Sequence, residues 1–139
     1  MNLKPRATTF LTTLVNSRET ASIEHLLHPN ITLQHNDLPP MSKSELIAFW
    51  PEVLAQSPNF RVQVRDVIQE GNKVWVYSRV EGRLGMGVMD DVHMLVFDEE
   101  GLMVRCRGVQ RVVEGEGKHS VEEESKGKES EICEGGGLM

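Results

Sequence analysis

The stretch that decides the fold is NFRVQVRDVIQEGNKVWVYSRV, residues 59–80. Apolar and polar side chains alternate from Phe60 to Ile68, and they alternate again after the turn at Gly71 and Asn72. A period of two is typical of strands with one buried face, and a short Gly-Asn turn between two such runs indicates a hairpin. This part of the chain therefore predicts two long antiparallel strands.

Two further strands are expected at residues 88–97 and 102–113, on either side of an acidic turn. The elements expected before the hairpin are short helices at residues 7–16 and 21–28, a brief strand at 31–35, and a helix that begins after Ser42. Ser42 and Glu45 form a capping box, in which each side chain satisfies a free backbone donor of the other residue. Helices followed by a strand meander predict an α+β fold, with helices packed on one face of a curved antiparallel sheet.

Composition divides the chain into a domain, residues 1–114, and a tail, residues 115–139. The tail is rich in Gly, Ser, Glu and Lys and holds seven glutamates against three lysines, so it carries −4 of the net charge of −6. Such a segment has too few apolar side chains to offset its ordering entropy, and we predict that it is disordered.

Charge and hydropathy exclude two classes of partner. An acidic chain without a Lys/Arg stripe is poorly suited to nucleic acid, because phosphate neutralisation dominates that affinity. No apolar run approaches the ~20 residues that a membrane-spanning helix needs. Two cysteines make no disulfide framework, so we expect an intracellular, cytoplasmic protein.

The order of elements resembles a known family in three places: residues 38–42 leading into the capped helix, residues 59–68, and residues 97–102. Residues 7–113 look like the SnoaL-like branch of the nuclear-transport-factor-like cone fold. They are most similar to small fungal isomerases and cyclases that rearrange polyketide, meroterpenoid or alkaloid intermediates. The resemblance implies a hydrophobic substrate enclosed in the cone, no cofactor, and a homodimer formed through the outer sheet face.

Acid/base chemistry without a cofactor needs proton donors and acceptors in a mostly apolar pocket. The candidates are His35, at the end of the first strand, and Asp90, Asp91 and His93 in the run at residues 88–97. Alternation puts Asp91 and His93 on one face and Asp90 on the other, but a slip of one residue would reverse the two aspartates. Alternatively, His35 caps a strand end at the surface, His93 is a satisfied core histidine, and both aspartates are solvated.

Three more residues are candidates for substrate binding. Arg107 is the best placed of three arginines that share one face of the last strand with Met103, although cross-strand pairing with Glu81 or Asp91 is the more common role. Gln110 lies on the opposite face with Cys106. Trp50 lies on the capped helix, where such a residue more often belongs to the core than to a ligand site.

Trp75, Tyr77 and Arg79 share one face of a hairpin strand. An aromatic and charged stripe on the side away from the helices suits a dimer interface better than a pocket. The resemblance thus favours a cofactor-independent isomerase or cyclase, with His35 or Asp91 as base and His93 as acid. The alternative is a non-catalytic small-molecule-binding or dimerisation module of the same fold. No histidines and carboxylates show the spacing of a metal site, so a metal hydrolase is disfavoured.

Overall fold

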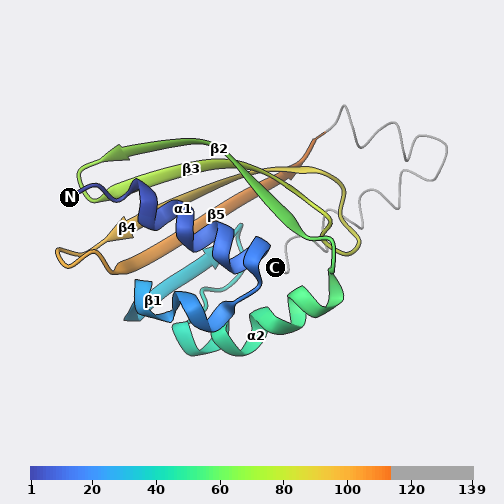
Figure 1. The fold of residues 1–139 in the computed structure, drawn as a ribbon, viewed down its shortest axis with the longest axis horizontal. Coiled ribbons are helices and arrows are strands. Elements are labelled where there is room, and N and C mark those ends of the chain that lie inside the picture. Colours follow the sequence, from blue (N-terminus) through green and yellow to red (C-terminus); the bar gives the residue numbers. More distant parts are fainter. Residues whose placement is uncertain (114–139) are drawn as a thin grey trace.

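The computed structural model describes residues 1–113, which form a five-stranded sheet covered on one face by helices (Figure 1). The helices are α1 (Lys4–Thr12), continued by a π-helical turn η1 (Thr13–Ser17), then a 3₁₀ helix η2 (Thr20–Leu26), and α2 (Lys43–Gln56). The strands are β1 (Leu27–His35), β2 (Arg61–Glu70), β3 (Lys73–Glu81), β4 (Met89–Phe97) and β5 (Met103–Val112). The predicted tail at residues 115–139 lies outside the described residues.

Helix α2 begins as the sequence predicts. The Ser42 hydroxyl accepts a hydrogen bond from the Glu45 backbone, and the Glu45 carboxylate accepts one from the Ser42 backbone at 2.8 Å. Pro51 lies inside this helix and does not end it. None of the helices within residues 1–113 is long and apolar enough to span a membrane.

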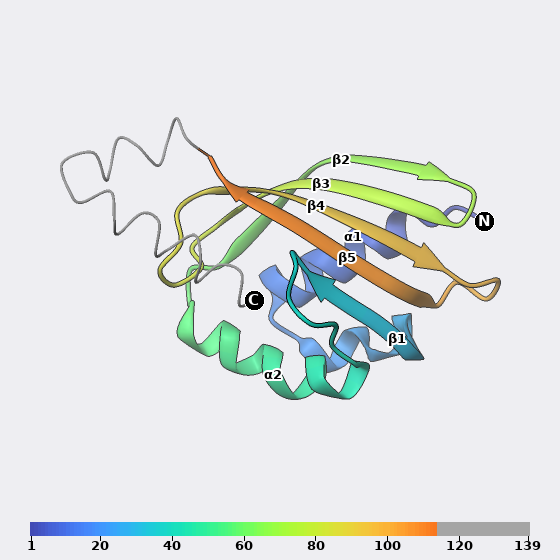
Figure 2. The same cartoon turned by 180° about the vertical axis from the view of Figure 1, so that it is seen from behind.

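The predicted α+β fold class is confirmed, with one correction to the sheet. The strand order is β1-β5-β4-β3-β2, and β1 runs parallel to β5, so the sheet is mixed and not wholly antiparallel. The meander of β2 to β5 is antiparallel, as the hairpin pattern predicts. Figure 2 shows β1 beside β5 at one edge of the sheet. This non-local pairing joins residues more than seventy positions apart in sequence.

The core lies between the sheet and the helices, and strand alternation decides which side chains enter it. On β3, Val74, Val76 and Ser78 are fully buried, whereas Trp75 is 52% exposed on the outer face and Tyr77 38%. The outward placement of this aromatic stripe is therefore confirmed. The buried apolar side chains form one continuous cluster that joins both helices to the inner sheet face.

One register prediction is wrong. The pairing of β4 with β5 shifts between Val96 and Phe97, so Met103 pairs with Phe97 and turns inward, fully buried. Arg105 remains exposed on the outer face. The two residues therefore lie on opposite faces, because a bulge interrupts the period of two that the sequence pattern assumes.

Candidate active site

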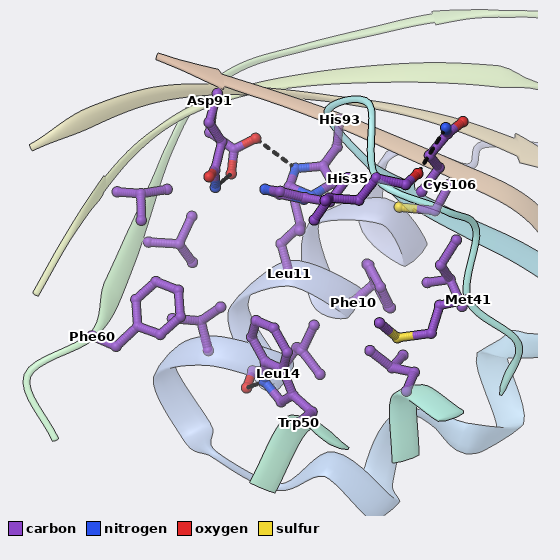
Figure 3. A pocket seen from close by; sticks show the side chains of 18 of the residues that line it. Phe10, Leu11, Leu14, His35, Met41, Trp50, Phe60, Asp91, His93 and Cys106 are labelled. Carbon is purple, nitrogen blue, oxygen red and sulfur yellow. Dashed lines mark hydrogen bonds and ion pairs between the residues drawn. The ribbon is translucent and has the colours of Figure 1, made fainter. Parts of the chain in front are cut away.

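A cavity opens between the helices and the inner face of the sheet, and most of its wall is hydrocarbon (Figure 3). The cavity has a volume of about 80 Å³, so the cone is hollow. The apolar lining residues include Phe10, Leu11, Leu14, Val15, Leu33, Leu38, Pro39, Met41, Leu46, Trp50, Phe60, Val62 and Val80. The polar lining residues are Gln34, His35, Asp91, His93 and Gln110, together with the thiol of Cys106. Figure 3 shows the labelled polar groups gathered at the sheet side, opposite the labelled apolar residues.

Strand β4 supplies two of these polar groups. Its odd-numbered residues, from Met89 to Phe97, are buried, whereas the even-numbered residues are partly exposed. This alternation brings Asp91 and His93 to the same inner face, where they are 3% and 9% exposed. Nδ1 of His93 lies 3.0 Å from Oδ1 of Asp91.

His35 reaches the same cavity from the end of β1. Strand β5 lies between β1 and β4, and its Gly108 is in register with His35 on one side and with His93 on the other. The two imidazole rings therefore meet over a residue without a side chain, with centroids 6.1 Å apart. A Cβ at Gly108 would lie 2.9 Å from His93 Nε2 and 3.0 Å from His35 Nδ1.

Gln110 joins this group from β5. Its amide donates to Oδ2 of Asp91 at 3.2 Å, and its backbone N–H donates to Oδ1 of Asn36 at 3.0 Å. The Asn36 backbone in turn donates to the carbonyl of Gly108 at 2.7 Å. These bonds tie the segment that follows His35 to β5 and so fix the direction in which His35 enters the cavity.

The Asp91–His93 pair stabilises its own charged form. Burial alone would lower the pKa of His93, but the charge of Asp91 and its hydrogen bond outweigh burial and raise that pKa above 6.5. Burial alone would raise the pKa of Asp91, but His93 and the Gln110 amide hold that pKa below its ordinary value. Both shifts favour the ionised forms, so Asp91 and His93 form an ion pair over a wider pH range than the two isolated groups would.

The pKa of His35 is shifted in the opposite direction. Burial lowers its pKa below 6.5 and the charge of His93 lowers it further, while Gln110 and Asp91 act in the other direction without reversing the shift. Its Nε2 is buried without a hydrogen-bond partner in the described part of the chain. An imidazole with a lowered pKa and an imidazole with a raised pKa thus share one apolar cavity, which is the arrangement that a base and an acid need.

Two candidates from the sequence do not reach the cavity. Asp90 lies on the outer face, where it accepts a hydrogen bond from the Tyr77 hydroxyl at 3.1 Å and pairs with Arg79 and Arg111 at 3.4 and 3.8 Å. Arg107 also points outward and interacts with Gln34 and Asp37. The pleat puts each of them on the side opposite its inward neighbours, so Asp90 as a catalytic residue and Arg107 as a cavity residue are both corrected.

The other candidates do line the cavity. Trp50 is 2% exposed, and its indole N–H donates to the Leu14 carbonyl at 2.9 Å, so its polar group serves the fold while its ring forms cavity wall. Cys106 is buried, and burial raises the pKa of its thiol, so it is unreactive wall. Within residues 1–113, no group of three or more His, Cys, Asp and Glu side chains is arranged to hold a metal ion.

Gly108 belongs to this candidate site, although the sequence alone did not single it out. A lone glycine inside an apolar strand pattern often marks a close approach by another group, and this signal is present between Arg107 and Val109. The pattern does not say which groups approach, because His35 and His93 come from strands far away in sequence.

Comparisons with known proteins agree on the family. The family model of the SnoaL-like domain matches residues 7–118. The chain is 84% identical over 114 residues to "Probable cyclase otaY" of Aspergillus carbonarius (strain ITEM 5010), which covers 82% of this chain and 93% of that protein. It is 69% identical over 113 residues to the protein of the same name from Aspergillus niger (strain ATCC MYA-4892 / CBS 513.88 / FGSC A1513), covering 81% and 95%.

Solved structures share the fold at low sequence identity. IdmH of Streptomyces antibioticus, called "a putative polyketide cyclase", superposes with a TM-score of 0.67 at 15% identity, covering 79% of this chain and 92% of that one. An NTF2-like protein of unknown function from Cytophaga hutchinsonii ATCC 33406 gives 0.65 at 12% identity, covering 80% and 91%. The resemblance stated from the sequence is thus confirmed, and the chain belongs to the SnoaL-like domain family.

Proposed function

We propose that this protein is an isomerase or cyclase of fungal secondary metabolism. It would act by acid/base catalysis, without a cofactor, on a polyketide, meroterpenoid or alkaloid-type intermediate enclosed in the cone. Membership of the SnoaL-like family and two close relatives named as probable cyclases support the reaction class. The observation that carries the proposal is the convergence of His35 with the Asp91–His93 ion pair in an apolar cavity.

His35 is the proposed base. Its lowered pKa keeps the ring neutral at neutral pH, and its buried Nε2 has no hydrogen-bond partner in residues 1–113 that would compete for an incoming proton. It would take a proton from a carbon that a neighbouring carbonyl makes acidic. The electron pair left behind would move onto the carbonyl oxygen as an enolate, next to the positive charge of His93.

His93 is the proposed acid, and Asp91 is its positioning residue. The carboxylate holds one ring nitrogen of His93, which leaves the other nitrogen, Nε2, on the side of His35 and Gly108. The imidazolium would stabilise the enolate and return a proton at another atom of the substrate. Apolar walls hold the substrate against both rings, and enclosure contributes as much as either group.

The alternative is a non-catalytic binding module that uses the same cavity. The largely apolar wall supports this alternative, because such a wall binds small hydrophobic molecules without further chemistry. Variants that keep the cavity and alter only its proton-transfer groups separate the two functions.

The test uses a strain of Aspergillus carbonarius that lacks its 84% identical relative. The strain is complemented with this chain or a variant, and its metabolites are compared by liquid chromatography and mass spectrometry. The unaltered chain should restore the product lost with the relative. Asp91→Asn should not, while Asp90→Asn, the same change one residue away on the outer face, should. Equal restoration by both variants would overturn the acid/base proposal.

We also propose a homodimer formed through the outer face of the sheet. The exposed apolar side chains on this face are Ile68 (61%), Trp75 (52%), Tyr77 (38%) and Val109 (44%). An apolar patch of this kind is a candidate interface, because monomers seldom leave large contiguous patches in water. An intracellular location remains a prediction from the sequence.

A further inference from the structure

Arg83 lies in the connection between β3 and β4 and is partly withdrawn from water. The other half-buried arginines of residues 1–113 have polar partners: Arg6, Arg18, Arg79 and Arg107 bond to backbone carbonyls, a carboxylate or an amide. Within the same residues, the Arg83 guanidinium has neither a hydrogen bond nor an ion pair. It lies over the face of Phe60, with 5.8 Å from Cζ to the ring centroid.

The connection holds Arg83 in place. Gly82 has a φ of +84°, and a Cβ at this position would lie 1.9 Å from the Asn59 carbonyl oxygen, so the backbone is packed directly against the segment before β2. The Leu84 N–H donates to the hydroxyl of Ser57, which is itself buried, at 2.8 Å. Arg83 is therefore fixed on both sides, and its partial burial is built into the fold.

Phe60 connects this arginine to the cavity. Its ring lines the cavity and packs against Trp50, with centroids 5.9 Å apart, while the guanidinium lies over it. The positive charge of Arg83 also contributes to the lowered pKa of His35, so the two groups are within electrostatic range of one another. Arg83 is not itself part of the cavity lining, but a molecule that lies against Phe60 and extends past its ring towards the connection between β3 and β4 would come within reach of the guanidinium.

The Arg83 guanidinium has lost part of its water shell and has no polar partner among residues 1–113, so it is open to a further ligand. Burial lowers the pKa of Arg83, yet the group stays charged at any physiological pH, so the cost of desolvation is not relieved by losing the proton. An anion would offset this cost. One guanidinium balances one charge, and its planar fork matches the two oxygens of a carboxylate.

We propose that Arg83 binds a carboxylate of the substrate, so that the cavity takes an apolar carboxylic acid in its ionised form. This inference rests on the proposed function, because it names the substrate class of the same cavity. It also has a consequence for the base. A carboxylate beside Arg83 cancels the guanidinium's effect on His35, which makes His35 a stronger base once the substrate is bound.

The test measures binding to the full chain carrying Trp75→Phe. The chain has two tryptophans, so this change leaves Trp50, in the cavity wall, as the single indole reporter. The probes are 3-phenylpropionate and its neutral amide, titrated at neutral pH while Trp50 fluorescence is recorded. We expect the carboxylate to bind about tenfold more tightly than the amide, as a hydrogen-bonded charge pair in a partly dry site predicts.

Adding Arg83→Gln should weaken carboxylate binding by about tenfold and leave amide binding unchanged. The matched control is Arg61→Gln, which alters an exposed arginine at the start of β2 and should keep the preference. Thermal unfolding checks that both variants are folded. The proposal is overturned if the starting protein binds both probes equally, or if Arg83→Gln retains the preference for the carboxylate.

The results of the binding test are independent of the complementation test, because binding of the probes requires no turnover. Loss of the carboxylate preference in Arg83→Gln, with an Asp91→Asn chain that still restores product, would support the substrate class and overturn the acid/base proposal. An unchanged preference with an inactive Asp91→Asn chain would do the reverse.

Discussion

The rings of His35 and His93 lie with centroids 6.1 Å apart and planes tilted by 50°, yet their environments shift their pKa values in opposite directions. His93 gains a buried carboxylate partner, whereas His35 gains burial and a positively charged neighbour. Two chemically identical side chains thereby acquire different proton affinities in one cavity. The pairing of β1 with β5 and of β5 with β4 creates this relationship.

The opposite pKa shifts of His35 and His93 predict a plateau in the pH profile of kcat/KM. Activity should fall at acid pH as His35 takes up a proton, with a midpoint below 6.5, because its pKa is lowered. Activity should fall at alkaline pH as His93 loses its proton, with a midpoint above 6.5. Asp91, whose pKa is lowered, stays ionised throughout. A rate that climbs steadily through the alkaline range would contradict the role of His93 as acid.

Gly108→Ala should separate the two rings. The added methyl group would lie 2.9 Å from His93 Nε2 and 3.0 Å from His35 Nδ1, so one or both imidazoles must move. A displacement of about 1 Å at a catalytic group can cost ~100-fold in rate, and we expect kcat to fall by that order. The matched control is Gly87→Ala, whose methyl group would make an ordinary 3.8 Å contact with Val112 and should keep full activity. Equal rates in both variants would remove Gly108 from the positioning of the site.

The sequence predicts those features of the site that depend on residues only a few positions apart. Alternation along β4 places Asp91 and His93 on the face of Leu95 and Phe97, and all four are buried. The capping box of α2 and the turn between β2 and β3 are local as well, because residues a few positions apart decide them. Short-range sterics and hydrogen bonding are sufficient for such features.

What could not be predicted depends on pairing between distant strands. Nothing near His35 in the sequence indicates that β1 lies parallel to β5, which brings the residue beside His93. The bulge that turns Met103 inward and the outward partners of Arg107 follow from register, and register is a property of two strands together. Alternation predicts which face of the sheet a polar side chain takes. It does not predict which side chain of another strand lies beside it.

His93→Gln should lower stability in a pH-dependent way. His93 has a raised pKa in the folded protein, so its pairing with Asp91 contributes stability that is fully present below the unfolded value of about 6.5 and is lost as pH rises through the folded value. Breaking a buried pair from one side costs about 3 kcal/mol. Urea unfolding of both proteins across this range should show the largest difference in free energy at acid pH. A difference that grows with pH would contradict the assigned direction.

Trp75→Glu tests the proposed dimer. Trp75 lies on the outer face of β3, beside Met94 on β4, and is 52% exposed, so a charge there would be buried without a partner if two copies met at this face. Sedimentation of the unaltered chain at micromolar concentration should give twice the chain mass of 15.7 kDa, and the variant should give the chain mass itself.

Leu84→Glu is the control, since Leu84 is similarly exposed, at 66%, but lies in the connection between β3 and β4. Because the cavity opens on the opposite side of the sheet, the monomeric variant should still bind 3-phenylpropionate. An unaltered chain that sediments as a monomer, or a Trp75→Glu chain that remains dimeric, would show that this face is not the interface.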